Sequence, residues 1–216
     1  MMSDRLVVYQ MSVGPLQVNC FIVACSKTKE AMVIDPGEEG ERILYVAGKE
    51  GLNIRKVVNT HGHFDHIGAN QYIIEKTGAE LLIHADDLPL LQNARNHAEV
   101  YGLQVAASPE PDRLLKQGDT LQVGELSFRV YHVPGHSPGG ICLLCEDHLF
   151  VGDVLFAGSI GRTDLPGGDF DALVKGVREQ LFALPDETIV HPGHGSDTTI
   201  GRERQVNPFV GDSAIL

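Results

Sequence analysis

The chain lacks any run of apolar residues of about 18 or more, the length that a membrane-spanning helix needs. Its mean hydropathy is -0.04 and 43% of its residues are hydrophobic, a composition typical of a water-soluble globular protein. The first residues, MMSDRLVVYQMSVGP, place Asp4 and Arg5 early and include no apolar segment of the kind found in a cleavable export signal. We therefore expect a cytoplasmic protein that has no membrane as a partner.

Basic residues are scarce. Lys and Arg number 17 against 29 Asp and Glu, so the formal net charge is -12. Nucleic acids and anionic membrane surfaces are bound by clustered Lys and Arg, and this composition excludes nucleic acid from the expected partners. An acidic chain is suited to hold a metal cation among carboxylate ligands, although acidity also serves solubility alone.

Cysteine is rare as well, and the four cysteines do not suggest a disulfide scaffold. Cys142 and Cys145 have the spacing of a redox or zinc-binding pair, but they lie in GICLLCE, which has the pattern of a buried strand. Side chains three residues apart on a strand point to opposite faces. We therefore predict that these two cysteines are packing residues.

The chain contains no linker, low-complexity tract or internal repeat, and 216 residues fit one domain. Short apolar runs rich in β-branched residues predict strands, and helical periodicity follows several of them. The expected strands span 6–10, 20–25, 31–37, 56–60, 79–84, 121–123, 126–133, 140–146, 148–156 and 188–193. The expected helices span 38–49, 68–76 and 171–184, with a short helix and then a loop between 86 and 111. Strands followed by strand–helix alternation, twice over, predict an α/β fold: a four-layered αββα sandwich of two sheets with helices outside.

The segment THGHFDH, residues 60–66, places three imidazoles and a carboxylate within a few positions of each other, directly after an expected strand. Burying so many ionisable groups without a partner would cost several kcal/mol. Neutral imidazoles and carboxylates together suit zinc, iron or manganese. His61 and His63 can point the same way in an extended turn, while Asp65 and His66 stand where a helix would begin. The spacing therefore fits two adjacent metal ions better than one.

One loop cannot complete two coordination shells, so further ligands are expected elsewhere. VPGHSPG contains His136, FVGDVLF contains Asp153, and HPGHG contains His194. Each of these segments follows or ends an expected strand, and the flanking Gly and Pro are typical of a tight, constrained loop.

In this order, THGHFDH, PGHSPG, GDVLF and PGHG resemble the motifs of the metallo-β-lactamase superfamily. The resemblance covers nearly the whole chain, from VIDPG at Val33 to the C-terminal tail. GRTDLPGGD and TIGRERQVNPF are most similar to glyoxalase II-type hydrolases of the compact kind. The resemblance implies that residues 1–216 form one metallo-β-lactamase-fold domain, without the C-terminal helical domain of full-length glyoxalase II. Only the segment from Ser196 to Leu216 follows Gly195.

The resemblance also implies seven protein ligands for two divalent metal ions, with zinc expected and iron or manganese as the alternatives. One ion would take three histidines, His61, His63 and His136. The other would take a mixed set, Asp65, His66 and His194. Asp153 would bridge the two ions.

The activity implied is hydrolysis of a thioester such as S-D-lactoylglutathione by a hydroxide that bridges the two metal ions. The small-molecule thioester is therefore the expected partner, and a glutathione conjugate is one form of it. Asp65 and Asp153 would act in catalysis as proton carriers as well as ligands. Asp35, in VIDPG, would orient a ligand imidazole or simply form the Asp-Pro-Gly turn. Asp164 would orient a ligand in the same way, and Arg162 would be structural or would face the substrate.

The residues also leave several other activities open. A persulfide dioxygenase that uses one iron has the same ligand types, and a lactonase needs the same hydroxide. Penicillin-type lactam hydrolysis is disfavoured by the absence of an export signal, and nucleases by the net charge. Flavin-partnered di-iron reductases carry a glutamate where His63 stands, and a catalytically idle relative would have lost a ligand. Oligomeric state is not indicated by any pattern in the sequence.

The remaining histidines have no predicted role in metal binding. His191 could orient the turn that carries His194, and His97 could face the site. His84 is expected to be structural, and His148 is expected to be exposed in a hairpin.

Overall fold

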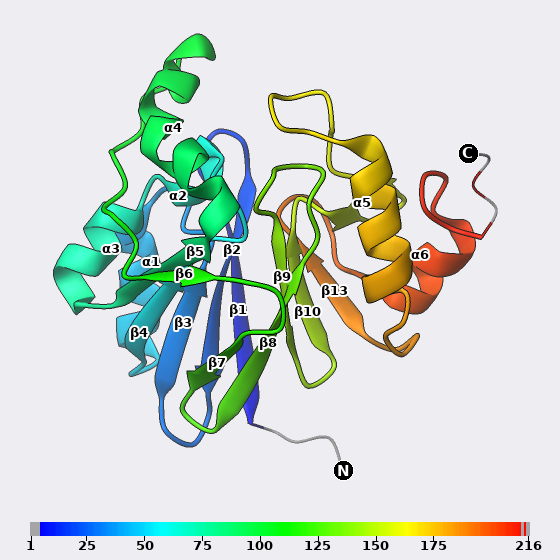
Figure 1. Cartoon of the computed structure of the whole chain (residues 1–216). Coiled ribbons are helices and arrows are strands. Elements are labelled where there is room, and N and C mark those ends of the chain that lie inside the picture. The colour runs from blue at the N-terminus through cyan, green and yellow to red at the C-terminus, as the bar shows by residue number, and fades with distance from the viewer. Residues whose placement is uncertain (1–4, 213, 215–216) are drawn as a thin grey trace.

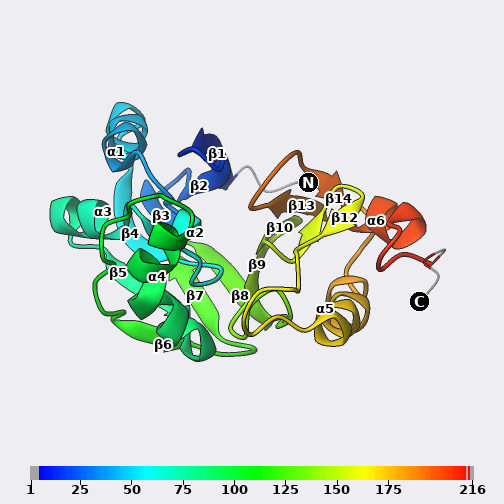
Figure 2. The same ribbon diagram turned by 90° about the horizontal axis from the view of Figure 1, so that it is seen from above.

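Two six-stranded sheets pack face to face, with helices on their outer sides (Figures 1 and 2). The computed structural model describes residues 5–212 and 214, so the predicted domain 1–216 includes terminal residues outside the described part. The predicted αββα sandwich is confirmed. In the described part of the chain, no helix is long and apolar enough to cross a bilayer.

The first sheet has the strand order β1-β2-β3-β4-β5-β6. β1, β2 and β3 pair antiparallel, and the strands from β3 to β6 pair parallel. The edge strand β6 was not predicted, because it is only three residues long and two of them are exposed. The strands are β1 (Leu6–Val13), β2 (Val18–Cys25), β3 (Glu30–Ile34), β4 (Asn53–Val58), β5 (Glu80–His84) and β6 (Arg113–Leu115).

The second sheet has the order β14-β13-β10-β9-β8-β7, and a small hairpin of β11 and β12 stands apart from it. The single strand expected over 148–156 is wrong: it is two strands, broken after Gly152. Gly152 has a φ of 49°, a backbone region that favours glycine, and the pairing of β10 with β13 shifts register there. The strands are β7 (Thr120–Val123), β8 (Leu126–His132), β9 (Ile141–Cys145), β10 (His148–Gly152), β11 (Leu155–Phe156), β12 (Ser159–Ile160), β13 (Ile189–Pro192) and β14 (Thr198–Thr199).

Helices form the two outer layers and one end of the sandwich. α1 (Gly40–Lys49) and α3 (Asn70–Thr77) pack on the first sheet, and α5 (Phe170–Gly176) and α6 (Ile200–Val206) on the second. α5 continues in a π-helical turn, η2 (Val177–Leu181), so the helix expected over 171–184 is shorter and less regular than predicted. The end helices are α2 (Phe64–Ile67), η1 (Ala85–Asp87) and α4 (Leu88–Val100). α4 is 13 residues long, longer than the short helix expected, and α6 was not predicted.

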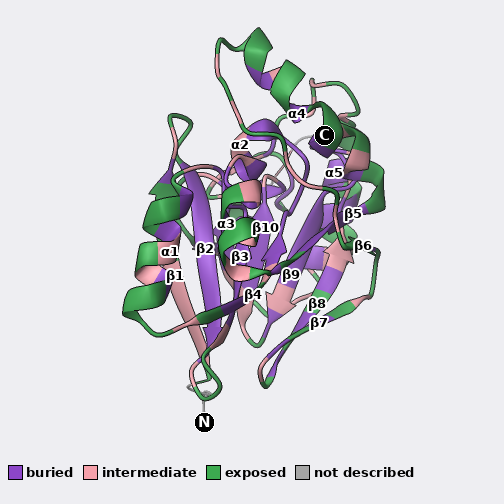
Figure 3. Cartoon of the chain, turned by 90° about the vertical axis from the view of Figure 1, so that its left-hand side faces the viewer, coloured by how far each residue is buried: buried purple, intermediate pink, exposed green. Residues whose placement is uncertain are grey.

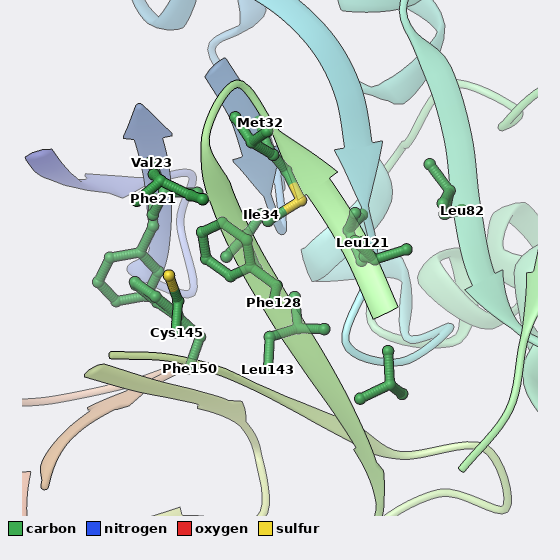
Figure 4. Packing of buried hydrophobic residues seen from close by; sticks show 14 of the residues in the cluster. Phe21, Val23, Met32, Ile34, Leu82, Leu121, Phe128, Leu143, Cys145 and Phe150 are labelled. Carbon is green, nitrogen blue, oxygen red and sulfur yellow. The ribbon is translucent and has the colours of Figure 1, made fainter. Parts of the chain in front are cut away.

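The main core lies between the two sheets. Phe21 from the first sheet meets Phe150 from the second with ring centroids 5.3 Å apart, and Phe128 packs beside them (Figure 4). Cys145 belongs to this core, whereas Cys142 packs under α5, so the two cysteines face opposite sides of β9 as predicted. Figure 3 shows the strands buried between helices whose outward surfaces are exposed. The loops that follow the strand ends carry the candidate site.

Candidate metal centre

The segments that carry the candidate ligands follow strands, at the end of the sandwich where α2 and α4 lie (Figure 1). β4 leads into the loop of His61 and His63, β8 into that of His136, β10 into Asp153 and β13 into His194. β10 and β13 pair in parallel, so their ends lie side by side. Rigid strands thus bring four loops, far apart in the sequence, to one place.

Three histidines form the first cluster. A ring nitrogen of each of His61, His63 and His136 lies within 4.8 Å of the others. His63 Nδ1 is 2.9 Å from His136 Nε2. All three side chains are buried. This cluster is the set predicted for one metal ion.

Asp65, His66 and His194 form the second cluster, and their ligand atoms also lie within 4.8 Å of one another. Asp65 Oδ2 is 3.6 Å from His66 Nε2 and 3.5 Å from His194 Nε2. Asp65 and His66 are both in α2, and the helix begins directly after His63. The turn from loop to helix therefore divides one short motif between two clusters.

Asp153 lies between the clusters. Its Oδ2 is 3.6 Å from His136 Nε2 of the first cluster and 3.6 Å from His194 Nε2 of the second. Its Oδ1 is 3.5 Å from His66 Nε2. A Cβ on Gly193 would come within 2.8 Å of His66 Cε1, so only glycine fits before His194. The structure thus brings together all seven residues that were predicted as ligands.

Asp35 supports residues of both clusters. Its Oδ2 is 2.9 Å from His66 Nδ1, and it also accepts the Thr60 hydroxyl at 2.6 Å. Thr60 Oγ1 in turn lies 3.1 Å from His61 Nδ1. A hydrogen on Nδ1 of each ring suits these contacts, and it leaves Nε2 free to bind a metal. Asp35 also has a left-handed backbone and accepts the Gly37 N–H, so it both forms the turn and holds an imidazole.

Arg162 acts on His136 through its backbone. Its carbonyl oxygen lies 2.8 Å from His136 Nδ1, which leaves His136 Nε2 for the metal side. The Arg162 guanidinium is exposed and pairs with Asp164 at 2.7 Å and 2.8 Å. Asp164 is therefore not an orienting residue for a ligand imidazole, because its side chain is turned to Arg162.

Buried polar atoms in these clusters lack protein partners. Among the described residues, His61 Nε2, His66 Nε2 and Asp153 Oδ1 are buried and accept or donate no hydrogen bond. Such atoms cost about 1–3 kcal/mol each when they stay unsatisfied. Imidazole nitrogens with a carboxylate oxygen are the donor set that zinc, iron and manganese take. The residues present therefore fit a pair of divalent metal ions.

The electrostatics of the clusters support the same conclusion. Burial and the neighbouring imidazoles lower the pKa of His61 well below its usual value, which keeps the ring neutral. Burial also acts to lower the pKa of His66, but the carboxylates of Asp153 and Asp65 outweigh it and raise that pKa. The carboxylates thus draw a positive charge to this point, and a metal cation that replaces the proton would supply it.

A cleft of about 490 Å³ opens onto both clusters and is lined by His63, Asp65, Asp153 and His194. One wall is aromatic: Phe64 packs against His97 and Tyr101, each with ring centroids 5.6 Å from it. The His97 ring lies 5.9 Å from that of His63, so His97 does face the site. The remaining walls are formed mainly by the apolar side chains of Leu16, Phe156, Ile160 and Leu165. Arg162 adds a cation to this lining.

Two histidines differ from expectation. His191 bonds His148 at 2.8 Å and lies 3.0 Å from Asp197, so it does not orient His194. His148 is partly buried by this contact and is not simply exposed. The expected structural role of His84 is supported by its ring, which stacks on that of His132 at 3.9 Å.

Fold and site together define a metallo-hydrolase-type sandwich with adjacent histidine and aspartate clusters at the ends of its strands. The chain belongs to the metallo-beta-lactamase superfamily, whose family model matches residues 13–194.

Three proteins are similar to this chain over nearly its whole length. The hydroxyacylglutathione hydrolase GloC of Haemophilus influenzae is 38% identical over 202 residues, which is 92% of this chain and 95% of GloC. The crystal structure of the BLEG-1 B3 metallo-beta-lactamase is 37% identical, with a TM-score of 0.89 over 94% of this chain and 99% of that one. The crystal structure of TTHA1623 in a di-iron-bound form is 40% identical, with a TM-score of 0.86 over 94% of this chain and 100% of that one.

Proposed function

We propose that this protein is a dinuclear metal-dependent hydrolase that cleaves a small-molecule thioester such as S-D-lactoylglutathione. The observation that carries the proposal is the position of Asp153, whose Oδ2 is 3.6 Å from an imidazole nitrogen of each cluster. A carboxylate in that position suits a bridge between two ions. Zinc is the metal we propose, with iron or manganese as the alternatives.

Each cluster would hold one ion: His61, His63 and His136 the first, and Asp65, His66 and His194 the second. Two ions held there would lower the pKa of a coordinated water toward about 7 and would polarise an acyl carbonyl. Asp35 and the Arg162 carbonyl keep the ligand rings in the orientation that this chemistry needs.

Hydrolysis adds water across the bond between the acyl carbon and sulfur. The carbon–sulfur bond breaks, a carbon–oxygen bond forms, and the products are a carboxylate and a thiol. We propose that Asp65, which lines the cleft, accepts the proton that the water loses. Phe64 and Tyr101 line one side of the cleft, where their rings would reduce the access of bulk water.

A thioester is favoured because a thiolate leaves without a strong general acid. The 38% identity to a protein named hydroxyacylglutathione hydrolase supports the glutathione form of this substrate. Arg162 is the cation that lines the cleft, so we propose that it meets a carboxylate of the substrate.

The direct test is cleavage of S-D-lactoylglutathione by zinc-loaded, iron-free protein, followed as loss of thioester absorbance. We expect multiple turnovers, with release of one thiol for each thioester lost. If no thioester is cleaved by protein that contains two zinc ions per chain, the proposed activity is wrong. Iron-loaded protein with a glutathione persulfide in an oxygen electrode then tests the dioxygenase alternative, and a lactone tests the lactonase.

Replacing Arg162 tests the proposed recognition of the substrate carboxylate. In Arg162→Gln we expect the KM for S-D-lactoylglutathione to rise about tenfold, the size of one charge-assisted hydrogen bond, with kcat nearly unchanged. Arg202→Gln is the matched control, because Arg202 is exposed on α6 and pairs with Glu203. Equal KM values for both variants and the unmodified protein would exclude Arg162 from substrate binding.

β-Lactam hydrolysis is a second candidate, favoured by the similarity to the BLEG-1 B3 metallo-beta-lactamase. A lactam carbonyl can be attacked in the same cleft, but its leaving amine needs a proton that a thiolate does not. Zinc-loaded protein should therefore be assayed against a chromogenic cephalosporin beside the thioester. A higher kcat/KM for the cephalosporin would make the lactam the preferred substrate.

A further inference from the structure

Asp87 is a fully buried carboxylate that the proposed chemistry does not use. It ends η1, just before α4, and lies outside both candidate clusters. Its Oδ2 accepts the Gly62 N–H at 2.9 Å and the Ser137 hydroxyl at 2.7 Å. Its Oδ1 accepts the Gly139 N–H at 2.6 Å. Three donors to one buried carboxylate make a strongly held contact.

The donors come from two loops that are remote in sequence. Gly62 lies between His61 and His63, and Ser137 directly follows His136. These three histidines are the first cluster, and the two loops are the ones that present them. Asp87 therefore ties together the backbone supports of the whole three-histidine cluster without touching an imidazole.

Glycine at two of the contacts permits this close approach. A Cβ on Gly62 would lie 2.8 Å from the Asp87 carbonyl oxygen. A Cβ on Gly139 would lie 2.6 Å from the Asp87 nitrogen and 2.8 Å from its Cγ. Both loops thus pack directly on Asp87. We therefore expect a displacement of the Asp87 side chain to shift both loops.

We infer that Asp87 is a positioning residue that sets the metal affinity of the three-histidine cluster and leaves that of the Asp65, His66 and His194 cluster unchanged. The inference rests on the proposed dinuclear centre. Asp35 differs, because it bonds His66 directly and reaches His61 through Thr60.

An asparagine at position 87 cannot keep all three bonds. If its amide nitrogen replaces Oδ1, it faces the Gly139 N–H, and two donors meet. If the amide nitrogen replaces Oδ2, it faces the Gly62 N–H. In either orientation one loop loses a backbone anchor, while the shape of the side chain is preserved.

The test separates the two clusters by disabling one at a time. His194→Ala leaves the three-histidine cluster, and His136→Ala leaves the other. Asp87→Asn is added to each, and the Zn²⁺ dissociation constant is measured by competition with a chromophoric chelator. In the His194→Ala background we expect Asp87→Asn to weaken Zn²⁺ binding about 10–100-fold, the usual effect of losing a residue that orients ligands. In the His136→Ala background we expect no change.

Equal weakening in both backgrounds, or none in either, overturns the inference, since a merely structural role would not choose between the clusters. Asp86→Asn is the control, because Asp86 adjoins Asp87 in η1 but its side chain is 59% exposed. If Asp87→Asn does not fold, Ser137→Ala decides, because it removes one of the three donors: selective weakening supports the inference and no effect overturns it. Unmodified protein that binds no Zn²⁺ would instead contradict the proposed function itself.

Discussion

Asp153→Asn is expected to lower hydrolysis of S-D-lactoylglutathione about a thousandfold and to reduce the metal content from two ions per chain to one. Asn has nearly the same shape, but it offers one neutral oxygen in place of two charged ones. The carboxylate lies between the clusters, so its loss removes a ligand from both. A second ion contributes several kcal/mol to stabilising the transition state, which corresponds to a rate factor of this size.

The measurement pairs steady-state kinetics with elemental analysis of the same sample. Asp147→Asn is a suitable control, since Asp147 adjoins the same strand β10 and lies 3.7 Å from His148. We expect this control to match the unmodified protein in both respects. If Asp153→Asn retained full activity and both ions, Asp153 would not be the bridge.

Removal of the metal with a chelator is expected to abolish hydrolysis and to lower the thermal unfolding midpoint by about 10–20 °C. An ion whose free concentration is about 100 times its dissociation constant stabilises the folded state by about 2.7 kcal/mol. Two such ions contribute about 5 kcal/mol. For a chain of this length, each kcal/mol shifts the midpoint by about 2–4 °C. Without the ions, the buried atoms His61 Nε2, His66 Nε2 and Asp153 Oδ1 would be left without a partner.

Differential scanning calorimetry of chelated and reloaded protein measures the shift. Zn²⁺ should restore both the midpoint and the activity, whereas Mg²⁺ should restore neither, because imidazole ligands do not suit it. An unchanged midpoint with activity lost would show that the ions act in catalysis alone. Activity that survives complete chelation would contradict a metal-dependent mechanism.

The fold was predictable where the pattern is local. Alternating and continuous apolar runs predicted nearly all of the strands of more than three residues, and the helical periods between them predicted α1 and α3. The errors lie where tertiary contacts decide the backbone. The expected strand over 148–156 is broken after Gly152, where β10 shifts register against β13. β14 and α6 follow a turn in the C-terminal segment, and the sequence pattern of that segment predicted neither of them.

For the site, too, the features that depend on local sequence were predicted and those that depend on tertiary contacts were not. The motif HGHFDH and the three loops after strands were visible as residue types and spacing, and so was the need for more than one metal. Asp87 was missed because an aspartate beside a helix start is usually a cap, and nothing local indicates that it accepts bonds from Gly62 and Gly139. Asp164 was misassigned because its nearest polar partner is two residues away, in Arg162, and not in the site.

By itself, therefore, the sequence determined the family, the sandwich and the chemical character of the ligands, because these follow from the local order of apolar runs and donor groups. The residue pattern alone left open which donors share a cluster. The family resemblance implied the grouping, and the tertiary structure produces it, since His136, Asp153 and His194 reach the first loop through the pairing of distant strands. The tertiary structure also decided which ring nitrogens face the metal side. The fold brings Asp35 to Nδ1 of His66 and the Arg162 carbonyl to Nδ1 of His136. Those contacts form only after the strands have paired, and no spacing along the chain encodes them.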